Sequence, residues 1–244
     1  MIVRVAVVPH PPILVPEVAA GAAGEIAVLR EACLVAARAL ASDCRHWVAV
    51  GAGDPAATGT AGTMRGYGAD VVVALTPDSA PPRDDLPLSM LVASWLRAQV
   101  DDPGLVVSPA PVPPGTTPAD CARIGRELAA GLAGTAEPVG LLVLGDGAAT
   151  HTVRAPGYFD PRAGGFDARI AAALASPDLG ALLAVDAGLS DELGVAGREA
   201  WQVGAAVAQA SASRWRGKLL HSAAPYGVAY HVALWEAALG EAAR

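Results

Sequence analysis

Two runs of uniformly apolar residues constrain the fold of this 244-residue chain most strongly. They read Trp47-Val-Ala-Val-Gly51 and Val139-Gly-Leu-Leu-Val-Leu-Gly145. A strand with one face in water alternates apolar and polar residues, whereas a strand covered on both faces is apolar throughout. Such strands lie in the middle of a sheet that has helices on both sides. We therefore expect an α/β fold with three layers, α/β/α, around a mostly parallel or mixed central sheet.

Short β-branched runs alternate with longer segments rich in Ala, Leu and Arg along the chain. Strands are expected at residues 2–8, 47–52, 70–75, 104–108, 139–145, 217–221 and 226–235. Helices are expected at residues 24–41, 86–100, 118–133, 164–175, 189–195 and 198–212. Clusters of Pro and Gly predict loops at 53–68, 76–85, 109–117 and 145–165. Because two strands come late, after several helices, we expect an antiparallel edge. No repeat or linker divides the chain, which predicts one domain over residues 1–244.

The composition excludes two classes of partner. The formal net charge is −7, and Lys218 is the only lysine, so the clustered positive charge that binds nucleic acid is missing. No apolar stretch reaches the roughly 20 residues that span a bilayer, so no membrane partner is expected. The three cysteines are widely spaced and form no metal knuckle, which is typical of a reducing compartment. We expect a cytoplasmic protein.

The first predicted strand ends in His10, which lies between Pro9 and Pro11. Each proline ring fixes its own φ and restricts the residue before it, so the local backbone has little freedom. An imidazole on such a turn is oriented before any ligand arrives, as a metal ligand or a catalytic base requires. The alternative is a strand-terminal histidine that hydrogen-bonds a neighbouring loop.

Two more polar loops follow predicted strands, and ligands of open α/β sheets gather beyond the carboxyl ends of the strands. Gly51-Ala-Gly53-Asp54 ends one strand, and Asp54 is either a ligand or the acid of an Asp-Pro turn. Gly145-Asp146-Gly147 ends another, and His151 follows five residues after Asp146. An Asp at that position can accept amide hydrogen bonds, orient a His or bind a metal. Asp167 is interpreted as a capping or first-turn acid of a helix. His231, on a late strand, is expected to be structural or at the surface.

Several of these pieces occur in the same order in a known family. The segments are Val8-Pro9-His10-Pro11-Pro12-Ile13-Leu14, Gly145-Asp146, Ala155-Pro156-Gly157-Tyr158 with Phe166-Asp167, and Ala224-Pro225-Tyr226-Gly227-Val228-Ala229-Tyr230. Together they resemble the class III extradiol ring-cleavage dioxygenases of the B-subunit type, whose wider superfamily includes the Memo-type proteins. The resemblance implies a three-layer α/β fold that binds non-haem Fe(II) through two His and one Glu. It also implies a catechol-type substrate and a further His as acid or base.

Carried over position by position, this resemblance yields an incomplete ligand set. His10 matches the first iron ligand, the second His is replaced by the Asp54 region, and Ala223 stands at the Glu position. The acid/base His falls at Ala149, with His151 two positions later. We therefore expect a divergent member with a degraded iron site. His10, Asp54 and Asp146 are the candidate metal ligands, for Fe(II) or another divalent ion, and the alternative is that no metal binds. His151 is the candidate catalytic residue.

Three functional hypotheses follow. The first is an enzyme, either a divergent metal-dependent dioxygenase or a hydrolase that reuses the cleft, acting on a small aromatic diol-like molecule. The second is a non-catalytic Memo-like binding or scaffold protein. The third is one subunit of a complex, including a homo-oligomer, in which tryptophans face a partner rather than the core. These tryptophans are Trp95, Trp201, Trp215 and Trp235.

Overall fold

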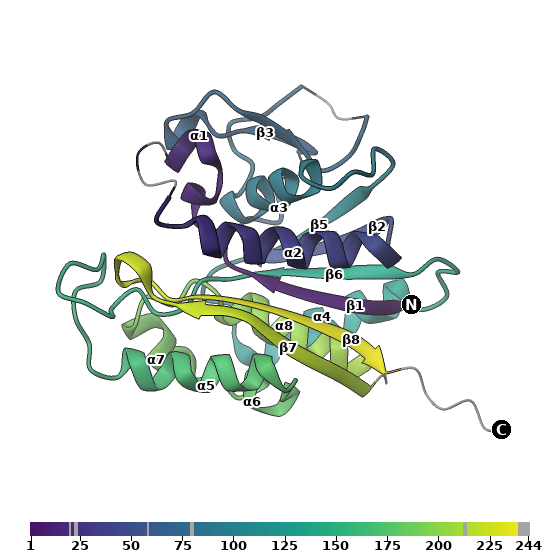
Figure 1. Cartoon of the computed structure of the whole chain (residues 1–244). Helices are drawn as coiled ribbons and strands as arrows, with labels where there is room; N and C mark the ends of the chain where they lie inside the picture. The colour runs from purple at the N-terminus through teal and green to yellow at the C-terminus, as the bar shows by residue number, and fades with distance from the viewer. Residues whose placement is uncertain (20, 22–23, 58, 79–80, 212–213, 239–244) are drawn as a thin grey trace.

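The fold is built around a six-stranded mixed sheet. In Figure 1 the sheet lies between an upper and a lower layer of helices. The computed structural model describes residues 1–19, 21, 24–57, 59–78, 81–211 and 214–238. The strands are β1 Ile2–Val8, β2 His46–Ala52, β5 Val106–Val112, β6 Val139–Leu144, β7 Arg214–Ala223 and β8 Tyr230–Ala238. Their order is β5-β2-β6-β1-β8-β7. β5, β2, β6 and β1 are mutually parallel, whereas β8 runs antiparallel to β1 and to β7.

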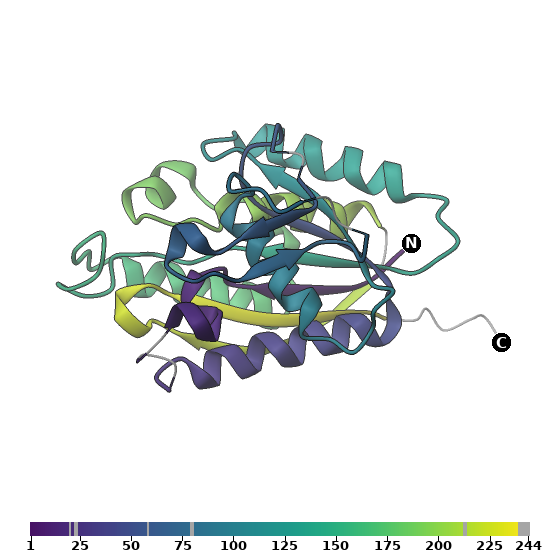
Figure 2. The same cartoon turned by 90° about the horizontal axis from the view of Figure 1, so that it is seen from above.

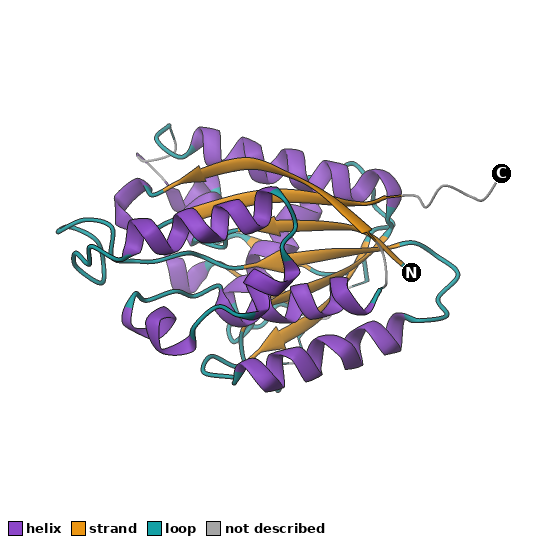
Figure 3. Cartoon of the chain, turned by 90° about the horizontal axis from the view of Figure 1, so that it is seen from below, coloured by secondary structure: helices purple, strands orange, loops and turns teal. Residues whose placement is uncertain are grey.

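Helices cover both faces of this sheet, each over its own apolar core. The helices on one face are α1 Pro16–Ala19, α2 Ala27–Asp43 and α3 Leu88–Ala98, which Figure 2 views from outside. The helices on the other face are α4 Pro118–Leu132, α5 Ala163–Ala175, α6 Leu179–Leu183, α7 Ala187–Glu192 and α8 Arg198–Ala210, seen in Figure 3. All six residues of β6 are buried, as a strand between two helical layers requires. The predicted three-layer α/β fold with an antiparallel edge is confirmed.

Several smaller elements complete the chain. A two-stranded antiparallel sheet, β3 Ala61–Thr63 with β4 Val72–Ala74, lies beside α3. Single 3-10 turns are η1 Pro12–Leu14, η3 Arg65–Tyr67 and η4 Pro225–Gly227. Neither β3 nor α6 was predicted, because each is too short to show a periodic pattern. Residue 212 of the expected helix at 198–212 lies outside the described residues.

The expected loop at 109–117 begins four residues too early, because β5 runs on to Val112. The strand continues to Val112 and includes Pro109 and Pro111, which pair with Ala49 and Gly51. Proline has no N–H for the ladder, so it is tolerated on an edge strand with its nitrogen facing outward. The two prolines are two residues apart, so their nitrogens point to the same side. β5 is the edge strand that makes this possible.

The tryptophans belong to the core rather than to an exposed interface. Trp201 and Trp235 are each 1% exposed and Trp95 is 5% exposed, while Trp215 is half-buried against the α5–α8 side. Packing within the chain accounts for the three buried tryptophans. Among the helices of the described residues, none is long and apolar enough to cross a bilayer.

Candidate functional site

The carboxyl ends of β1, β2 and β6 lie at one edge of the sheet, opposite the marked N-terminus in Figure 1. The loops that follow these strands carry His10, Asp54 and Asp146. β6 lies between β1 and β2, so its loop is next to both. The structure therefore places the three predicted loops on a common edge, as parallel neighbouring strands require.

His10 and Asp146 meet at this edge. The backbone N–H of His10 donates to Asp146 Oδ1 at 2.7 Å, and the ring Nδ1 lies 3.4 Å from the same oxygen. Nδ1 is buried and has no aligned hydrogen-bond partner among the described residues, so the ring contact is electrostatic only. The side chain of His10 is 8% exposed and that of Asp146 is 16% exposed. The expected pairing of the proline-bounded histidine with the Gly-Asp turn is present.

The negative charge of Asp146 acts on two nearby protonated groups. Burial, and after it the charge of Asp146, raises the pKa of the Tyr230 hydroxyl. The same two causes raise the pKa of the Cys33 thiol. Both groups therefore stay neutral at physiological pH, and Asp146 is the nearby negative charge that they face.

Asp54 does not join His10 and Asp146. It is exposed. Its Oδ1 accepts the backbone N–H of Ala56 at 2.8 Å, and this hydrogen bond closes a turn around Pro55. The N–H of Gly53, just before Asp54, donates to Val112 O at the end of β5, on the side of β2 away from β1. Of the two expectations for Asp54, the geometry shows the Asp-Pro turn.

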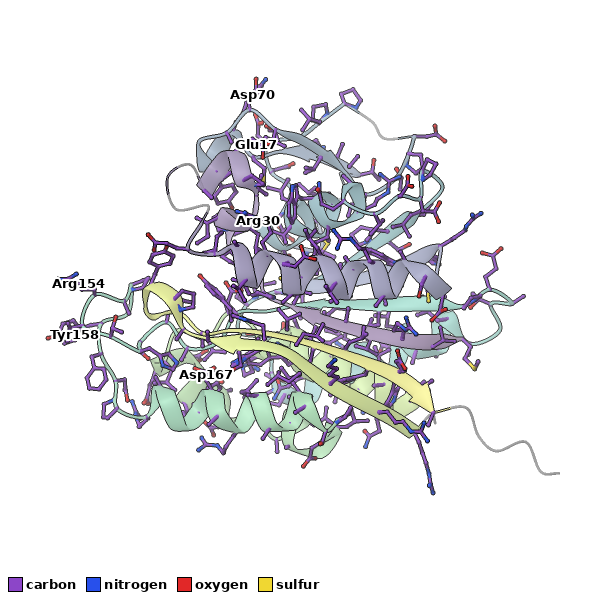
Figure 4. The ribbon with its side chains drawn as sticks, viewed as in Figure 1. Glu17, Arg30, Asp70, Arg154, Tyr158 and Asp167 are labelled. Carbon is purple, nitrogen blue, oxygen red and sulfur yellow. The ribbon has the colours of Figure 1, made fainter. Side chains whose placement is uncertain are left out.

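A second group of polar side chains is centred on Asp167 of α5. His151 Nε2 lies 2.6 Å from Asp167 Oδ2, and His231 Nε2 lies 3.0 Å from Oδ1. The backbone N–H of Ala148 also donates to this carboxylate, at 3.2 Å from Oδ2. On the far side of the His231 ring, Nδ1 lies 3.0 Å from Ser222 Oγ. Figure 4 labels Asp167 where α5 meets the β7–β8 hairpin.

This Asp167 cluster is mostly shielded from water. Asp167 is 5% exposed and His231 is 1% exposed, and the His231 ring lies 6.3 Å from the ring of Trp201. The His151 side chain, at 18%, reaches the surface. An ionised carboxylate only accepts hydrogen bonds, so both Nε2 atoms carry the proton. Each ring then presents an Nδ1 lone pair: that of His231 to Ser222, and that of His151 to the exterior.

Two loops position the Asp167 cluster from the backbone. Gly147 N–H donates to Ala229 O, Ala229 N–H donates to Ala148 O, and His151 N–H donates to Gly227 O. The β6 loop and the turn before β8 are thereby joined into one unit. A Cβ on Gly147 would lie 2.3 Å from Asp167 Oδ1, so only glycine lets the carboxylate approach the Ala148 amide.

The sequence interpretation of Asp167 was wrong. Asp167 lies in the second turn of α5 and caps nothing, since the first turn has no acid. A signal was present: the buried residues of α5 recur with helical spacing, and Asp167 falls on that face. They are Ala163, Phe166, Asp167, Ile170, Ala173 and Leu174. A surface position for His231 is also excluded, because β8 buries it on the face of Ala233 and Trp235. Ser222 was missed because nothing in the sequence pairs it with His231.

The iron site implied by the family resemblance needs two His and one carboxylate on one face of the metal. The described residues offer His10, with its unpartnered buried Nδ1, and Asp146. They contain no group of three His, Cys, Asp or Glu placed to hold one ion. Ala223, at the Glu position, offers no ligand. The residues at hand therefore do not fit a facial triad.

A surface hollow of about 650 Å³ lies at the opposite, amino edge of the sheet. Charged side chains line it, among them Arg45 and Asp102, which form an ion pair at 3.2 Å. It contains none of the expected site residues, so its size carries no information about the chemistry at the carboxyl edge.

Comparison with known proteins finds similar solved structures but no family. No protein-family model matches the sequence, and a search of curated proteins finds no match. A crystal structure of an uncharacterized protein from Escherichia coli K12 is similar over 96% of this chain and 99% of that chain, with 12% identity and a TM-score of 0.47. That degree of similarity assigns neither a family nor an activity.

Proposed function

We propose that this chain is a divergent relative of the extradiol dioxygenases whose remaining chemistry is proton abstraction by His151. The ligand is a small aromatic diol-like molecule, and this choice rests on the sequence resemblance. The 2.6 Å contact between His151 Nε2 and the buried Asp167 carboxylate is the observation that carries the proposal. It supports a base because it fixes the proton on Nε2 and leaves Nδ1 free to accept.

The chemistry follows from the pair. A ligand hydroxyl donates to His151 Nδ1, the imidazole takes the proton, and Asp167 stabilises the imidazolium that forms. General-base assistance of this kind contributes typically about 10²- to 10⁴-fold to a rate. Ring cleavage is left out, because the described residues supply two metal donors rather than three.

The test is a titration with catechol and with a carboxylated catechol at neutral pH, followed by ultraviolet difference absorbance. A bound catecholate absorbs differently from neutral catechol, so the spectrum reports proton removal directly. We expect the catecholate band with the unmodified protein and its loss in His151→Gln. His46→Gln is the matched control, because His46 lies at the start of β2 and bonds Ser108 instead of a carboxylate.

Calorimetry on the same samples separates binding from proton removal. His151→Gln is expected to bind the neutral catechol with a similar affinity and without the band. If neither compound binds the unmodified protein, or if His151→Gln produces the same catecholate band, the proposal is wrong. Binding by the unmodified protein without a band supports the non-catalytic binding protein instead.

A further inference from the structure

Ser222 and His231 face each other across the two last strands. They are a register pair of the β7–β8 hairpin, and Ser222 Oγ lies 3.0 Å from His231 Nδ1. Ser222 is exposed, whereas His231 is 1% exposed. The hydroxyl of an exposed residue is thus bonded, in a partly buried contact, to an almost fully buried imidazole.

The direction of this hydrogen bond is fixed from the other side of the ring. His231 Nε2 lies 3.0 Å from Asp167 Oδ1, and the carboxylate accepts, so the ring proton is on Nε2. Nδ1 then carries a lone pair, and the Ser222 hydroxyl donates to it. Nucleophile, base and orienting carboxylate follow one another in the order that activates serine in hydrolases. Compared with the usual serine triad, the two ring nitrogens of His231 have opposite roles: Nδ1 is the base, and Nε2–H donates to the carboxylate.

The strand edge gives a reagent access to Ser222. β7 is an edge strand, and Ser222 and its neighbour Ala223 are both exposed. On an edge strand, alternate backbone N–H groups point away from the partner strand. One of any two successive residues around Ser222 therefore offers an outward N–H, the type of donor that stabilises a developing oxyanion.

We propose that Ser222 is an activated nucleophile that accepts the acyl group of a small, sterically open ester. Ser222 Oγ attacks the carbonyl carbon while its proton passes to His231 Nδ1. The bond to the leaving oxygen then breaks, and that oxygen takes the proton from Nδ1. Water repeats the sequence on the acyl-serine and releases the carboxylic acid. This activity is separate from proton removal by His151, although both use Asp167.

The test is covalent labelling of the intact protein with a fluorophosphonate, followed by peptide mass spectrometry. A bond forms between Ser222 Oγ and phosphorus, and fluoride leaves. We expect the label on Ser222, at a rate that falls at least about 100-fold in His231→Gln, as loss of a general base implies. Two serines of the same chain serve as controls. Ser108 has a histidine partner, His46, and no carboxylate bonded to that ring in the described structure. Ser176 is exposed after α5 and has no imidazole bonded to it there.

The labelling rates of Ser222, Ser108 and Ser176 are compared within the unmodified protein, so this comparison does not depend on the folding of a variant. No label on Ser222, or labelling of all three serines at similar rates, overturns the proposal. An unchanged Ser222 rate in folded His231→Gln also overturns it. His151→Gln is expected to keep the label while losing the catecholate band, and Ser222→Ala is expected to do the reverse. The two proposals therefore fail independently.

Discussion

The His10–Asp146 pair and the Asp167 cluster lie at the same end of the molecule but differ in how completely their polar atoms are paired. Both oxygens of Asp167 accept, from two imidazoles and a backbone amide. Asp146 accepts the backbone N–H of His10, and the buried Nδ1 of His10 is left without an aligned partner. Both regions contain segments of the sequence resemblance, but only at Asp167 do both carboxylate oxygens have hydrogen-bond donors. In this chain, the most recognisable sequence motif, around His10, is therefore not the place where the polar side chains are most fully hydrogen-bonded.

The largest expected difference between the two regions is in unfolding free energy, when the aspartate of each is replaced by asparagine. Asp167→Asn places an NH₂ group against an N–H donor in a buried setting, which leaves a donor unsatisfied and costs about 2–3 kcal/mol of unfolding free energy. Asp146→Asn keeps a carbonyl oxygen for the His10 amide, at a side chain that is 16% exposed. Its expected cost is under about 1 kcal/mol. Urea unfolding of the two variants measures both values. Equal losses, or a larger loss at Asp146, contradict the comparison.

A smaller steric effect tests the close approach that makes the Asp167 cluster possible. Gly147→Ala puts a Cβ 2.3 Å from Asp167 Oδ1 and 2.8 Å from Ala229 Cβ, and is expected to destabilise by about 1–3 kcal/mol. Gly164→Ala, in the first turn of α5, has nothing within 4 Å of the new Cβ. It is expected to be neutral or to stabilise by up to about 1 kcal/mol, because alanine favours helix. Thermal unfolding compares the pair, and a neutral Gly147→Ala would show that the carboxylate is not held against this loop.

The next prediction concerns metal binding at His10, whose buried Nδ1 has no hydrogen-bond partner among the described residues. One imidazole and one carboxylate hold Fe(II) poorly, so metal is expected to stabilise the fold by under about 1 kcal/mol at moderate excess. Anaerobic addition of Fe(II), dialysis and metal analysis should leave far less than one equivalent. His10→Ala should remove the remaining binding. One equivalent of iron retained through His10 would show that further ligands complete the site.

The smallest effect concerns pH and His221, the neighbour of Ser222. Burial, and after it the charge of nearby His231, lowers the pKa of His221 from its ordinary 6.5. The unfolded chain then takes up this proton at higher pH than the folded chain. Stability from this residue is therefore present above pH 6.5 and lost as the pH falls below it. His221→Gln should flatten the curve of unfolding free energy just below pH 6.5, and an unchanged slope would contradict the assigned burial.

The sequence predicts the three layers well, because a strand buried on both faces is apolar at successive positions. β6 reads apolar at every position and is buried at every position. The meeting of His10 with Asp146 follows from parallel strands, but only once β1 is known to lie beside β6, and local pattern does not set strand order. The helical spacing of α5 could have placed Asp167 on its buried face, but the interpretation as a capping acid overlooked it. The partnership of Ser222 with His231 depends on an irregular register between Leu219 and His221, and a shift of one residue would separate them.

The protonation pattern around Asp167 is the central claim, and nitrogen-15 NMR of the histidine rings tests it most directly. At neutral pH, the neutral rings of His151 and His231 are expected as Nε2–H tautomers, with Nδ1 as the acceptor nitrogen in both. In Asp167→Ala this preference should weaken in both rings, while the signals of His46 stay unchanged. An Nδ1–H tautomer at His231 in the unmodified protein would contradict the account, because Ser222 would then have no base and Asp167 no donor from that ring.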